Sequence, residues 1–384
     1  MLEYKIDFYQ NILTLAILII GYVIVFMIGV KQKKDIAKVT FLYVWHTLFS
    51  LVYYLFSLSN ASDATVNYRH SLSLNAFEFY PGSPFIKLVA SFFSKGLDAS
   101  YLNTTLCFGL IGCIGLILLY LSLKEYLKAF PWYWGLILFI PSMSFWTASL
   151  SKDPISFFAV CLFLYAVTTS KKTLLLTSIA FFAMFMVRPH VGALILASYV
   201  IYFIIRARVH ILFKMITIPA IFAGLMLSIT FVEQYIGLDE SSVDSYSDYI
   251  AGRESSNSWG GSSIDISSMS YPMKMFTYIF RPLPIEAHNI TSLITSIENV
   301  ILLFLFLFIL FKSKFNLKPF IRDKNLWLFT YFLLTCSILA LTTANLGIAT
   351  RQKWMFMPVI IYLLIYVFHE YKLKSVKTKK LDSY

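Results

Sequence analysis

Apolar runs about as long as a membrane is thick follow one another along most of this chain. A transmembrane helix needs roughly 17 to 25 largely apolar residues, and about 11 runs reach or approach that length. They cover residues 12–30, 39–58, 101–123, 132–150, 154–170, 173–187, 191–205, 211–232, 293–311, 326–344 and 354–368. The pattern predicts an all-α, polytopic membrane protein in which residues 1–384 form a single transmembrane domain.

Two apolar stretches depart from this simple pattern. Residues 84–97 are short and contain two lysines, which favours an amphipathic helix lying in the outer membrane interface over a span. The stretch 173–205 is interrupted by Arg188-Pro189-His190, with lysines before it and arginines after it. If both ends are cytoplasmic, this stretch is a hairpin of two short helices with Arg188 at its outer tip.

Composition and charge fix the class of protein and its orientation. The chain is 58% hydrophobic and 14% charged, with a mean hydropathy of +0.72, which excludes a water-soluble globule. With the N-terminus outside, about 21 of the 32 Lys and Arg residues fall in cytoplasmic loops, while about 15 of the 20 acidic residues fall outside. This imbalance predicts an outer N-terminus and a cytoplasmic C-terminus, with a basic tail over residues 371–384. No nucleic-acid partner is expected.

The one long hydrophilic stretch, residues 233–289, is predicted to be a large loop on the outer side. Its first half is rich in Ser, Gly, Asp and Tyr and has little apolar periodicity, which is typical of a mobile loop that closes over a substrate. Apolar residues return from Tyr271 to Phe280, and Arg281-Pro282-Leu283-Pro284 then stops any helix. Glu286 and His288 follow just before the chain re-enters the membrane.

Charged residues of the outer side form the candidate site. The cations come from several different outer segments: Arg69, Lys152, Arg188, Arg253, Arg281 and Arg351. The acids and histidines are Asp63, Asp153, Glu286, Glu298, His190 and His288. Such a set fits a polyprenyl pyrophosphate, because Arg and Lys make charge-assisted contacts to its oxygens while its tail stays in lipid. Three aromatic residues of the loop, Tyr246, Tyr249 and Trp259, suit stacking on sugar rings.

Several of these residues also have a purely structural interpretation. Asp153 followed by Pro154 fits a helix N-cap and first helical position, although Lys152 beside that helix start favours a phosphate site. Arg188 and Arg351 fit side chains that extend toward lipid headgroups as well as they fit ligands. A lone outer Asp63 is usually a solvated residue. These alternatives stay open at the level of sequence.

Several functional classes lack support in the sequence. It contains no Gly-rich phosphate loop, no His and Glu spacing for a metal, and no nucleotide-binding domain. The chemistry is therefore expected to proceed without a metal or another cofactor. No internal repeat is visible, which disfavours an inverted-repeat transporter.

The architecture resembles the bacterial O-antigen and exopolysaccharide polymerases, the Wzy-like group, which share many helices, an enlarged late outer loop and outer arginines next to helix starts. The chain is also similar to membrane glycosyltransferases of the GT-C type, through Asp63 and the segments SLSKDP, MVRPH, FRPLPIEAHN and NLGIATRQK. The resemblance implies a multi-pass protein of the bacterial cytoplasmic (inner) membrane that acts in surface polysaccharide synthesis.

In this resemblance, a glycan passes from an undecaprenyl-pyrophosphate donor to an undecaprenyl-linked acceptor on the outer face. Three arginines, Arg188, Arg281 and Arg351, would hold the pyrophosphate, and the further substrate-binding residues would be Lys152, Arg69 and Arg253. Glu286 or His288 would be the base. The expected partners are the lipid-linked oligosaccharide, the bilayer and other membrane proteins of polysaccharide assembly.

Two other functions remain as alternatives. A GT-C-type enzyme that uses a polyprenyl-phosphate sugar would take Asp63 as the competing base. A flippase for lipid-linked oligosaccharides would have charges along a path through both leaflets, whereas here the charges gather on one side.

Overall fold

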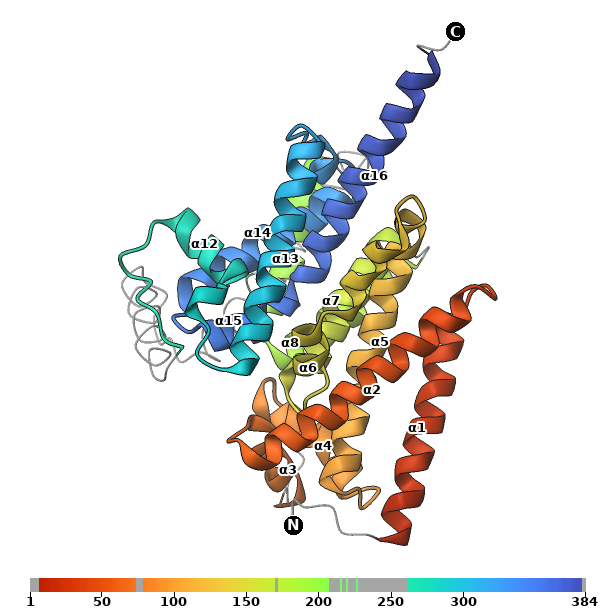
Figure 1. The fold of residues 1–384 in the computed structure, drawn as a ribbon. Helices are drawn as coiled ribbons and strands as arrows, with labels where there is room; N and C mark the ends of the chain where they lie inside the picture. Colours follow the sequence, from red (N-terminus) through yellow and green to blue (C-terminus); the bar gives the residue numbers. More distant parts are fainter. Residues whose placement is uncertain are drawn as a thin grey trace. The chain divides into compact units, whose positions relative to one another are not determined.

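The computed structural model describes residues 7–73, 79–169, 172–206 and 262–381, together with the single positions 215, 219 and 226. Helices make up most of these residues (Figure 1), and none of them belongs to a β-strand. One isolated antiparallel bridge joins Ser263 to Asn345. The predicted all-α class is confirmed.

The chain divides into two compact units. The first comprises Met1–Lys124 and Trp132–Gly192, and the second comprises Glu125–Pro131 and Ala193–Tyr384. The prediction of a single transmembrane domain stays a prediction.

The first unit contains helices joined by short connections. Its elements are α1 (Phe8–Gly29), α2 (Asp35–Ser59), α3 (Asp63–Ser73), α4 (Ser83–Ser94), α5 (Tyr101–Leu127, which ends in the second unit), η1 (Trp132–Phe139), α6 (Pro141–Thr147), α7 (Lys152–Thr168) and α8 (Thr173–Val187). Helix α7 packs along α8, α3 packs on α4, and α2 contacts α1 and α6. Nearly every residue of α5 from Tyr101 to Leu123 is buried, so this helix forms the centre of the unit.

Two glycines explain how closely other segments approach α5. A Cβ atom on Gly109 would lie 2.1 Å from Ser50 Oγ of α2. A Cβ atom on Gly112 would lie 2.0 Å from the carbonyl oxygen of Thr147 at the end of α6. Real Cβ atoms do not sit that close to other heavy atoms, so a larger residue at Gly112 would push α6 away from α5, whereas one at Gly109 would displace the Ser50 side chain.

An aromatic core fills one end of the first unit and sets the position of the segment before α7. Tyr101 packs on Tyr54 and Tyr68, with ring centroids 5.5 and 5.2 Å apart. Leu150 and Val187 belong to the same buried cluster. The ends of α6 and α8 are therefore held against α2, α3 and α5.

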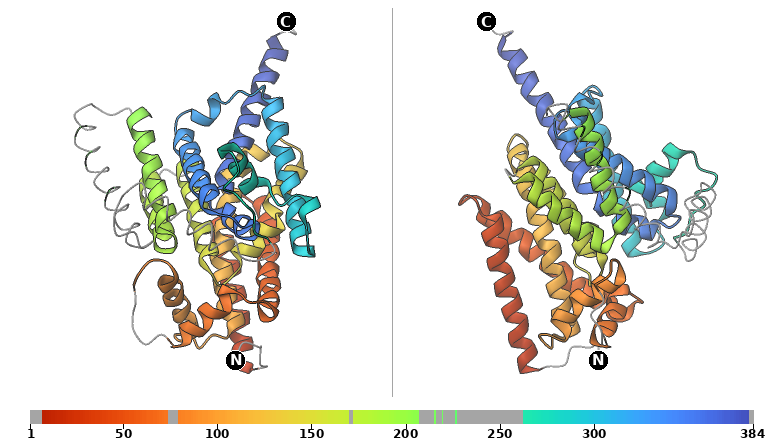
Figure 2. Two further views of the ribbon diagram at one scale, coloured as in Figure 1. Left: turned by 90° about the vertical axis from the view of Figure 1, so that its left-hand side faces the viewer. Right: turned by 180° about the vertical axis from the view of Figure 1, so that it is seen from behind.

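The second unit contains the elements that follow. They are α9 (Pro189–Arg206, which begins in the first unit), α12 (Tyr271–Phe280), η2 (Pro284–Glu286), α13 (Ile290–Lys312), η3 (Lys318–Ile321), α14 (Asn325–Thr342), α15 (Leu346–Gln352), η4 (Lys353–Met355) and α16 (Met357–Leu381). Both α13 and α14 pack on α16, and α12 contacts α13, α14 and α15 (Figure 2).

Six of the described helices are long and apolar enough to cross a membrane: α1, α2, α5, α9, α13 and α14. A seventh span results if α15 with η4 is joined to α16 across a bend of 62°. The protein is thus a multi-pass helical membrane protein. The predicted number of 11 spans and the predicted orientation remain predictions, and the run 211–232 lies almost wholly outside the described residues.

One predicted helix is not continuous. Residues 132–150 were expected to form a single helix, but the structure has η1 and the short helix α6 there, separated at Ile140. Pro141 starts α6, and Ile140 before it takes an extended conformation with φ −65° and ψ 120°. A residue before proline is driven out of the α region, so the apolar run could not continue as one helix.

Two other predictions fit the structure closely. The interrupted stretch 173–205 does form two helices, α8 and α9, which are separated at Arg188. Gly192 lies directly against the backbone of Phe185, so the chain reverses at this point. Residues 84–97 were expected to form an amphipathic helix, and α4 covers most of this range; its buried residues include Ile86 and Ala90.

Candidate functional site

A charged turn follows α12 in the second unit. α12 ends at Phe280 because Pro282 and Pro284 have no backbone N–H to continue it, and the Arg281–Pro282 peptide bond is cis. Arg281 Nε donates to Glu286 Oε1 over 2.8 Å, and its Nη2 contacts the same oxygen. Leu283 N donates to Glu286 Oε2 over 2.7 Å. One carboxylate therefore closes the turn and fixes the guanidinium.

The environment of Glu286 keeps it ionised. Its pKa lies below the ordinary value of 4.5, mainly because Arg281 donates hydrogen bonds to the carboxylate and partly because Leu283 N does so. Both carboxylate oxygens already accept hydrogen bonds. A carboxylate in this state is a weak base, so the geometry favours Glu286 as the residue that positions Arg281.

A buried polar pair, Asn299 and Lys353, is hydrogen-bonded to the same turn. Asn299 on α13 and Lys353 in η4 are both 0% exposed, and Lys353 Nζ donates to Asn299 Oδ1. Asn299 Nδ2 donates in turn to the carbonyl oxygen of Pro282 over 3.1 Å. The turn that carries Arg281 is thereby tied to α13 and to the start of the last helix. We call Arg281, Glu286, Asn299 and Lys353 the Arg281 cluster.

Further polar groups surround the Arg281 cluster. Arg351 lies on α15, two residues before Lys353, and is partly buried. Its neighbour Gln352 accepts a hydrogen bond from Tyr278 of α12 over 3.5 Å. His288 is exposed and lies just before Asn289, which caps α13 by accepting from Ser292 N. The predicted residues Arg281, Glu286, His288 and Arg351 therefore all lie in the second unit, on α15 and on the turn between α12 and α13.

The described end of the large hydrophilic stretch is anchored next to this site. Ile264 N donates to Ala344 O over 3.0 Å, and Leu346 N donates to Ser262 O over 2.9 Å. Asn345 between them also caps α15, because its Oδ1 accepts from Gly347 N and Ile348 N. Arg253 and the aromatic residues Tyr246, Tyr249 and Trp259 lie outside the described residues.

The first unit brings together another pair of predicted residues. Arg188 Nη2 donates to Asp153 Oδ1 over 2.8 Å, with the two side chains only 11% and 4% exposed. The N-cap of α7 is Ser151, which accepts from Asp153 N and donates to Asp153 Oδ2, so the prediction of Asp153 as the cap is wrong. Arg188 Nε is buried without a hydrogen-bond partner among the described residues. Through this ion pair, Asp153 joins the start of α7 to Arg188, which lies at the break between α8 and α9.

The remaining predicted residues lie elsewhere in the first unit. Asp63 and Arg69 are exposed on α3, and Lys152 is the first residue of α7. Asn67, which lies between Asp63 and Arg69 on α3, donates to Leu150 O over 3.2 Å. This hydrogen bond holds α3 against the segment that leads into α7. Whether any of these residues binds substrate stays a prediction.

Comparison with known proteins identifies the group to which the chain belongs. The model of the EpsG family matches residues 91–381. This protein belongs to the EpsG family. The EpsG family is a polysaccharide polymerase-like group of glycosyltransferases, and the match covers the Arg281 cluster and the Asp153–Arg188 pair. It does not reach Asp63 or Arg69. No curated protein and no solved structure matches the chain.

Two residues of the Arg281 cluster, Asn299 and Lys353, were not among the candidate residues expected from sequence. Asn299 lies inside the apolar run 293–311, and Lys353 directly precedes the apolar run 354–368. The only available signal was their type, since Asn and Lys are costly in an apolar helix unless they are partnered. The two residues are partners of each other and lie 54 residues apart, a pairing that no local pattern reveals.

Proposed function

We propose that this protein polymerises lipid-linked oligosaccharide repeat units on the outer face of the bacterial cytoplasmic membrane. The donor is an undecaprenyl-pyrophosphate-linked glycan and the acceptor is an undecaprenyl-linked repeat unit. Membership of the EpsG family supports the general class of reaction. The observation that carries the specific proposal is the Arg281 cluster, in which a guanidinium is fixed by Glu286 on a turn tied to Asn299.

The cluster has the chemistry needed to bind a pyrophosphate. Arg281 uses two of its five N–H groups on Glu286, which leaves three N–H groups for other acceptors. A planar guanidinium held in this way pairs bidentately with phosphate oxygens at little further cost in side-chain entropy. Arg351 and Lys353 add positive charge on the neighbouring segment, so the leaving group is stabilised as its negative charge develops.

In the proposed reaction, a hydroxyl oxygen of the acceptor attacks the anomeric carbon of the donor. The bond from that carbon to the pyrophosphate oxygen breaks, and undecaprenyl pyrophosphate leaves with the electron pair. We assign the hydroxyl proton to His288, because it is exposed beside Glu286 and Glu286 is committed to Arg281. Arg188 and Lys152 are assigned to the first unit's own framework, with Arg188 acting through Asp153.

The orientation is part of the proposal. An outer N-terminus and 11 spans place Arg281, His288 and Arg351 on the outer side, where the donor presents its glycan. The distribution of cations along the sequence supports this arrangement.

The proposal is tested by Arg281→Lys in cells that make the polymer. Lys keeps the charge but cannot make the bidentate contact, so we expect a loss of about 1.5 to 3 kcal/mol, or roughly ten- to more than a hundred-fold in rate. Single lipid-linked repeat units should accumulate on the outer face. Glu286→Gln should cause the same loss of polymerisation, because it releases the guanidinium of Arg281. The variants must reach the membrane at normal abundance.

Arg322→Lys is the matched control, because Arg322 also pairs with a carboxylate, Glu370 at 3.1 Å, on a segment that the orientation places in the cytoplasm. It should polymerise normally. Polymer of wild-type length from Arg281→Lys would contradict the pyrophosphate role. Accumulation of repeat units on the cytoplasmic face would instead identify a flippase.

A further inference from the structure

A surface rich in lysine lies in the second unit, on the connection between α13 and α14 and on the adjoining part of α16. Its exposed lysines are Lys312, Lys314, Lys318, Lys324, Lys372 and Lys374. Arg322 joins the two segments, because it pairs with Glu370 of α16 over 3.1 Å. Asn299 of the Arg281 cluster and Lys312 are 13 residues apart on α13, which corresponds to about 20 Å. We call these six lysines the lysine surface, and it is separate from the Arg281 cluster.

Large apolar side chains lie among these cations. The exposed ones are Phe311, Phe315, Leu317, Ile321 and Leu373. Phe311 and Phe315 are 64% and 57% exposed, and their rings meet edge to face with centroids 5.2 Å apart. Exposed apolar and aromatic side chains beside lysines are typical of protein segments at the boundary between hydrocarbon and lipid headgroups.

The connection between α13 and α14 has a defined shape. Phe320 is 3% exposed and packs on Phe329 of α14, with ring centroids 5.5 Å apart. Lys314 and Phe315 have φ values of 55° and 51°, in the left-handed region that residues other than glycine rarely adopt. Phe315 N donates to Leu310 O over 2.9 Å and holds this reversal of the chain. The exposed side chains of Lys314 and Phe315 are therefore presented by an ordered turn.

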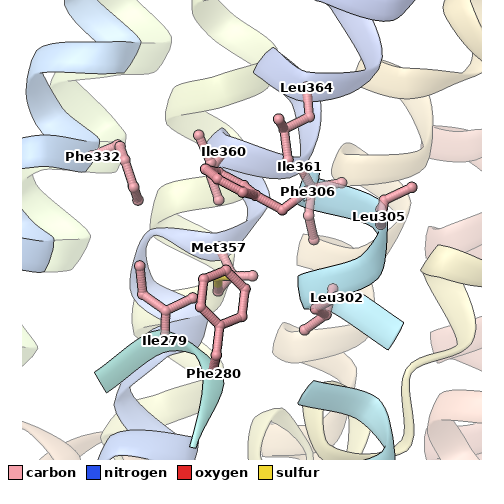
Figure 3. Close-up of a pocket in the computed structure, with 10 residues that line it drawn as sticks. All are labelled: Ile279, Phe280, Leu302, Leu305, Phe306, Phe332, Met357, Ile360, Ile361 and Leu364. Carbon is pink, nitrogen blue, oxygen red and sulfur yellow. The ribbon is translucent and has the colours of Figure 1, made fainter. Parts of the chain in front are cut away.

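The helices on either side place the lysine surface at the level of lipid headgroups. Both α13 and α14 are long and apolar enough to cross a membrane, and the connection begins where α13 ends at Lys312. Farther along these helices, a small space among α12, α13, α14 and α16 is lined only by apolar side chains, such as Leu302 and Leu364 (Figure 3). A bilayer around these spans therefore has its hydrocarbon at that apolar level and its phosphate groups near the lysine surface.

The charge of the connection is unbalanced. Residues 312–324 contain five cations and one acid, Asp323. No ion pair joins Lys314 or Lys318 to another residue that the structure describes. By contrast, Arg281 and Lys353 of the Arg281 cluster are partly or fully buried and donate hydrogen bonds within the protein. The cations of the connection can therefore pair with an anion outside the protein.

We propose that the lysine surface binds anionic phospholipid at the adjoining membrane surface, which the predicted orientation makes the cytoplasmic leaflet. The ammonium groups pair with lipid phosphates, while the lysine stems and the exposed apolar side chains lie against the upper part of the acyl chains. The occupant is a lipid because large apolar side chains surround the cations, and a soluble anion cannot cover them. The inference does not depend on the proposed function, since no residue of the Arg281 cluster takes part.

The test uses the full-length protein in detergent and two phospholipids with identical acyl chains, phosphatidylglycerol and phosphatidylcholine. Native mass spectrometry measures how much of each lipid is bound as its concentration rises. We expect the wild type to bind phosphatidylglycerol more tightly than phosphatidylcholine, and the difference to shrink as ionic strength rises.

The decisive variant is Lys314→Asn combined with Lys318→Gln. It removes two cations, and Asn tolerates the left-handed backbone at position 314. A cation near an anionic membrane surface contributes about fivefold in affinity, so phosphatidylglycerol should bind roughly 25-fold more weakly to this variant. Binding of phosphatidylcholine should not change. If the double variant lowers the yield of folded protein, Lys318→Gln alone repeats the test with an expected loss of about fivefold.

Two matched controls accompany the test. Lys314→Arg with Lys318→Arg keeps both charges and should bind phosphatidylglycerol as the wild type does. Lys33→Gln with Lys34→Gln removes the same number of exposed lysines from the turn between α1 and α2, and should leave the tight binding unchanged.

Three outcomes would overturn the proposal. The first is equal binding of phosphatidylglycerol by the wild type and by the variant without the two cations. The second is an equal loss in the Lys33 and Lys34 control, which would mean that lipid responds only to total charge. The third is displacement of phosphatidylglycerol by an equal concentration of glycerol phosphate, which would identify a general phosphate site. Unchanged lipid binding together with loss of a co-purifying acidic membrane protein would assign the surface to a protein partner instead.

Discussion

Lys353 Nζ donates a hydrogen bond to Asn299 Oδ1 at a point where neither side chain is exposed. A buried ammonium is costly unless it has an acceptor, and the amide oxygen of Asn299 provides one. The same amide uses its nitrogen on Pro282 O, 3.1 Å away. Asn is suited to this position because its side-chain amide has both an acceptor, Oδ1, and a donor, Nδ2. The turn that carries Arg281 depends on both of these groups.

The double role of Asn299 predicts different outcomes for two substitutions. Asn299→Asp keeps an acceptor for Lys353 but cannot donate to Pro282 O, so we expect a stable protein whose polymerisation falls by about tenfold, the effect of one lost hydrogen bond. Asn299→Leu also removes the acceptor for Lys353 and should lower the free energy of unfolding by about 3 kcal/mol. Thermal unfolding in detergent and polymer analysis on gels separate the two effects. Wild-type polymer from Asn299→Asp would show that the bond to Pro282 is dispensable.

Glu286 predicts a specific pH dependence of stability. Its pKa in the folded protein lies below 4.5, mainly because of the hydrogen bonds from Arg281. A group with a lowered pKa stabilises the fold at pH values above its unfolded pKa, and this contribution is lost as pH falls through the folded pKa. The difference in melting temperature between wild type and Glu286→Gln should therefore be constant from pH 8 to about pH 5 and shrink at lower pH. A difference that stays constant below pH 5 would mean that Arg281 does not lower the pKa of Glu286.

The Asp153–Arg188 pair should behave as a coupled structural unit. Removing one partner of a buried pair typically costs about 3 to 5 kcal/mol, whereas replacing both by apolar residues is often neutral. We expect Asp153→Leu and Arg188→Met each to destabilise the protein and the double variant to recover most of the loss. The recovered double variant should still polymerise. A folded but inactive double variant would return Arg188 to the substrate-binding residues.

The orientation can be checked independently of activity. Reporter fusions after Lys34, Lys172, Arg208, Lys318 and Lys380 should all report the cytoplasm, because the cations gather in these segments. An external signal at Arg208 would mean that residues 173–205 cross the membrane only once, and the assignment of the outer site would then fail.

The sequence was most informative where prolines and charges interrupt apolar runs. The run from Thr173 to Val187 became α8 and the run from Tyr271 to Phe280 became α12, with the same bounds. The prediction failed at Pro141. The run 132–150 was judged by its apolar composition, which does not show the helix break that the single proline imposes. The N-cap of α7 moved to Ser151 because serine, too, is a strong cap and lies two residues earlier.

The site was predicted only in part for a different reason. Arg281 and Glu286 are five residues apart, so their pairing lies within the reach of local reasoning. The partner of Arg188 lies 35 residues away and that of Lys353 lies 54 residues away. Such contacts depend on how helices pack, and helix packing is not encoded in any short motif. Arg188 was therefore noticed as a charge without its partner, and Lys353 was not noticed as a site residue.

The bridge between Ser263 and Asn345 has a consequence for how proteins of this kind diversify. It fixes the chain at Ser262–Ile264 to the start of α15, so a change in length or sequence before Ser262 ends at this anchor and is not passed on to Arg281. We expect a variant with a different sequence before Ser262 to keep the hydrogen bonds of Ser262 and Ile264 to the start of α15 and the Arg281–Glu286 turn that follows.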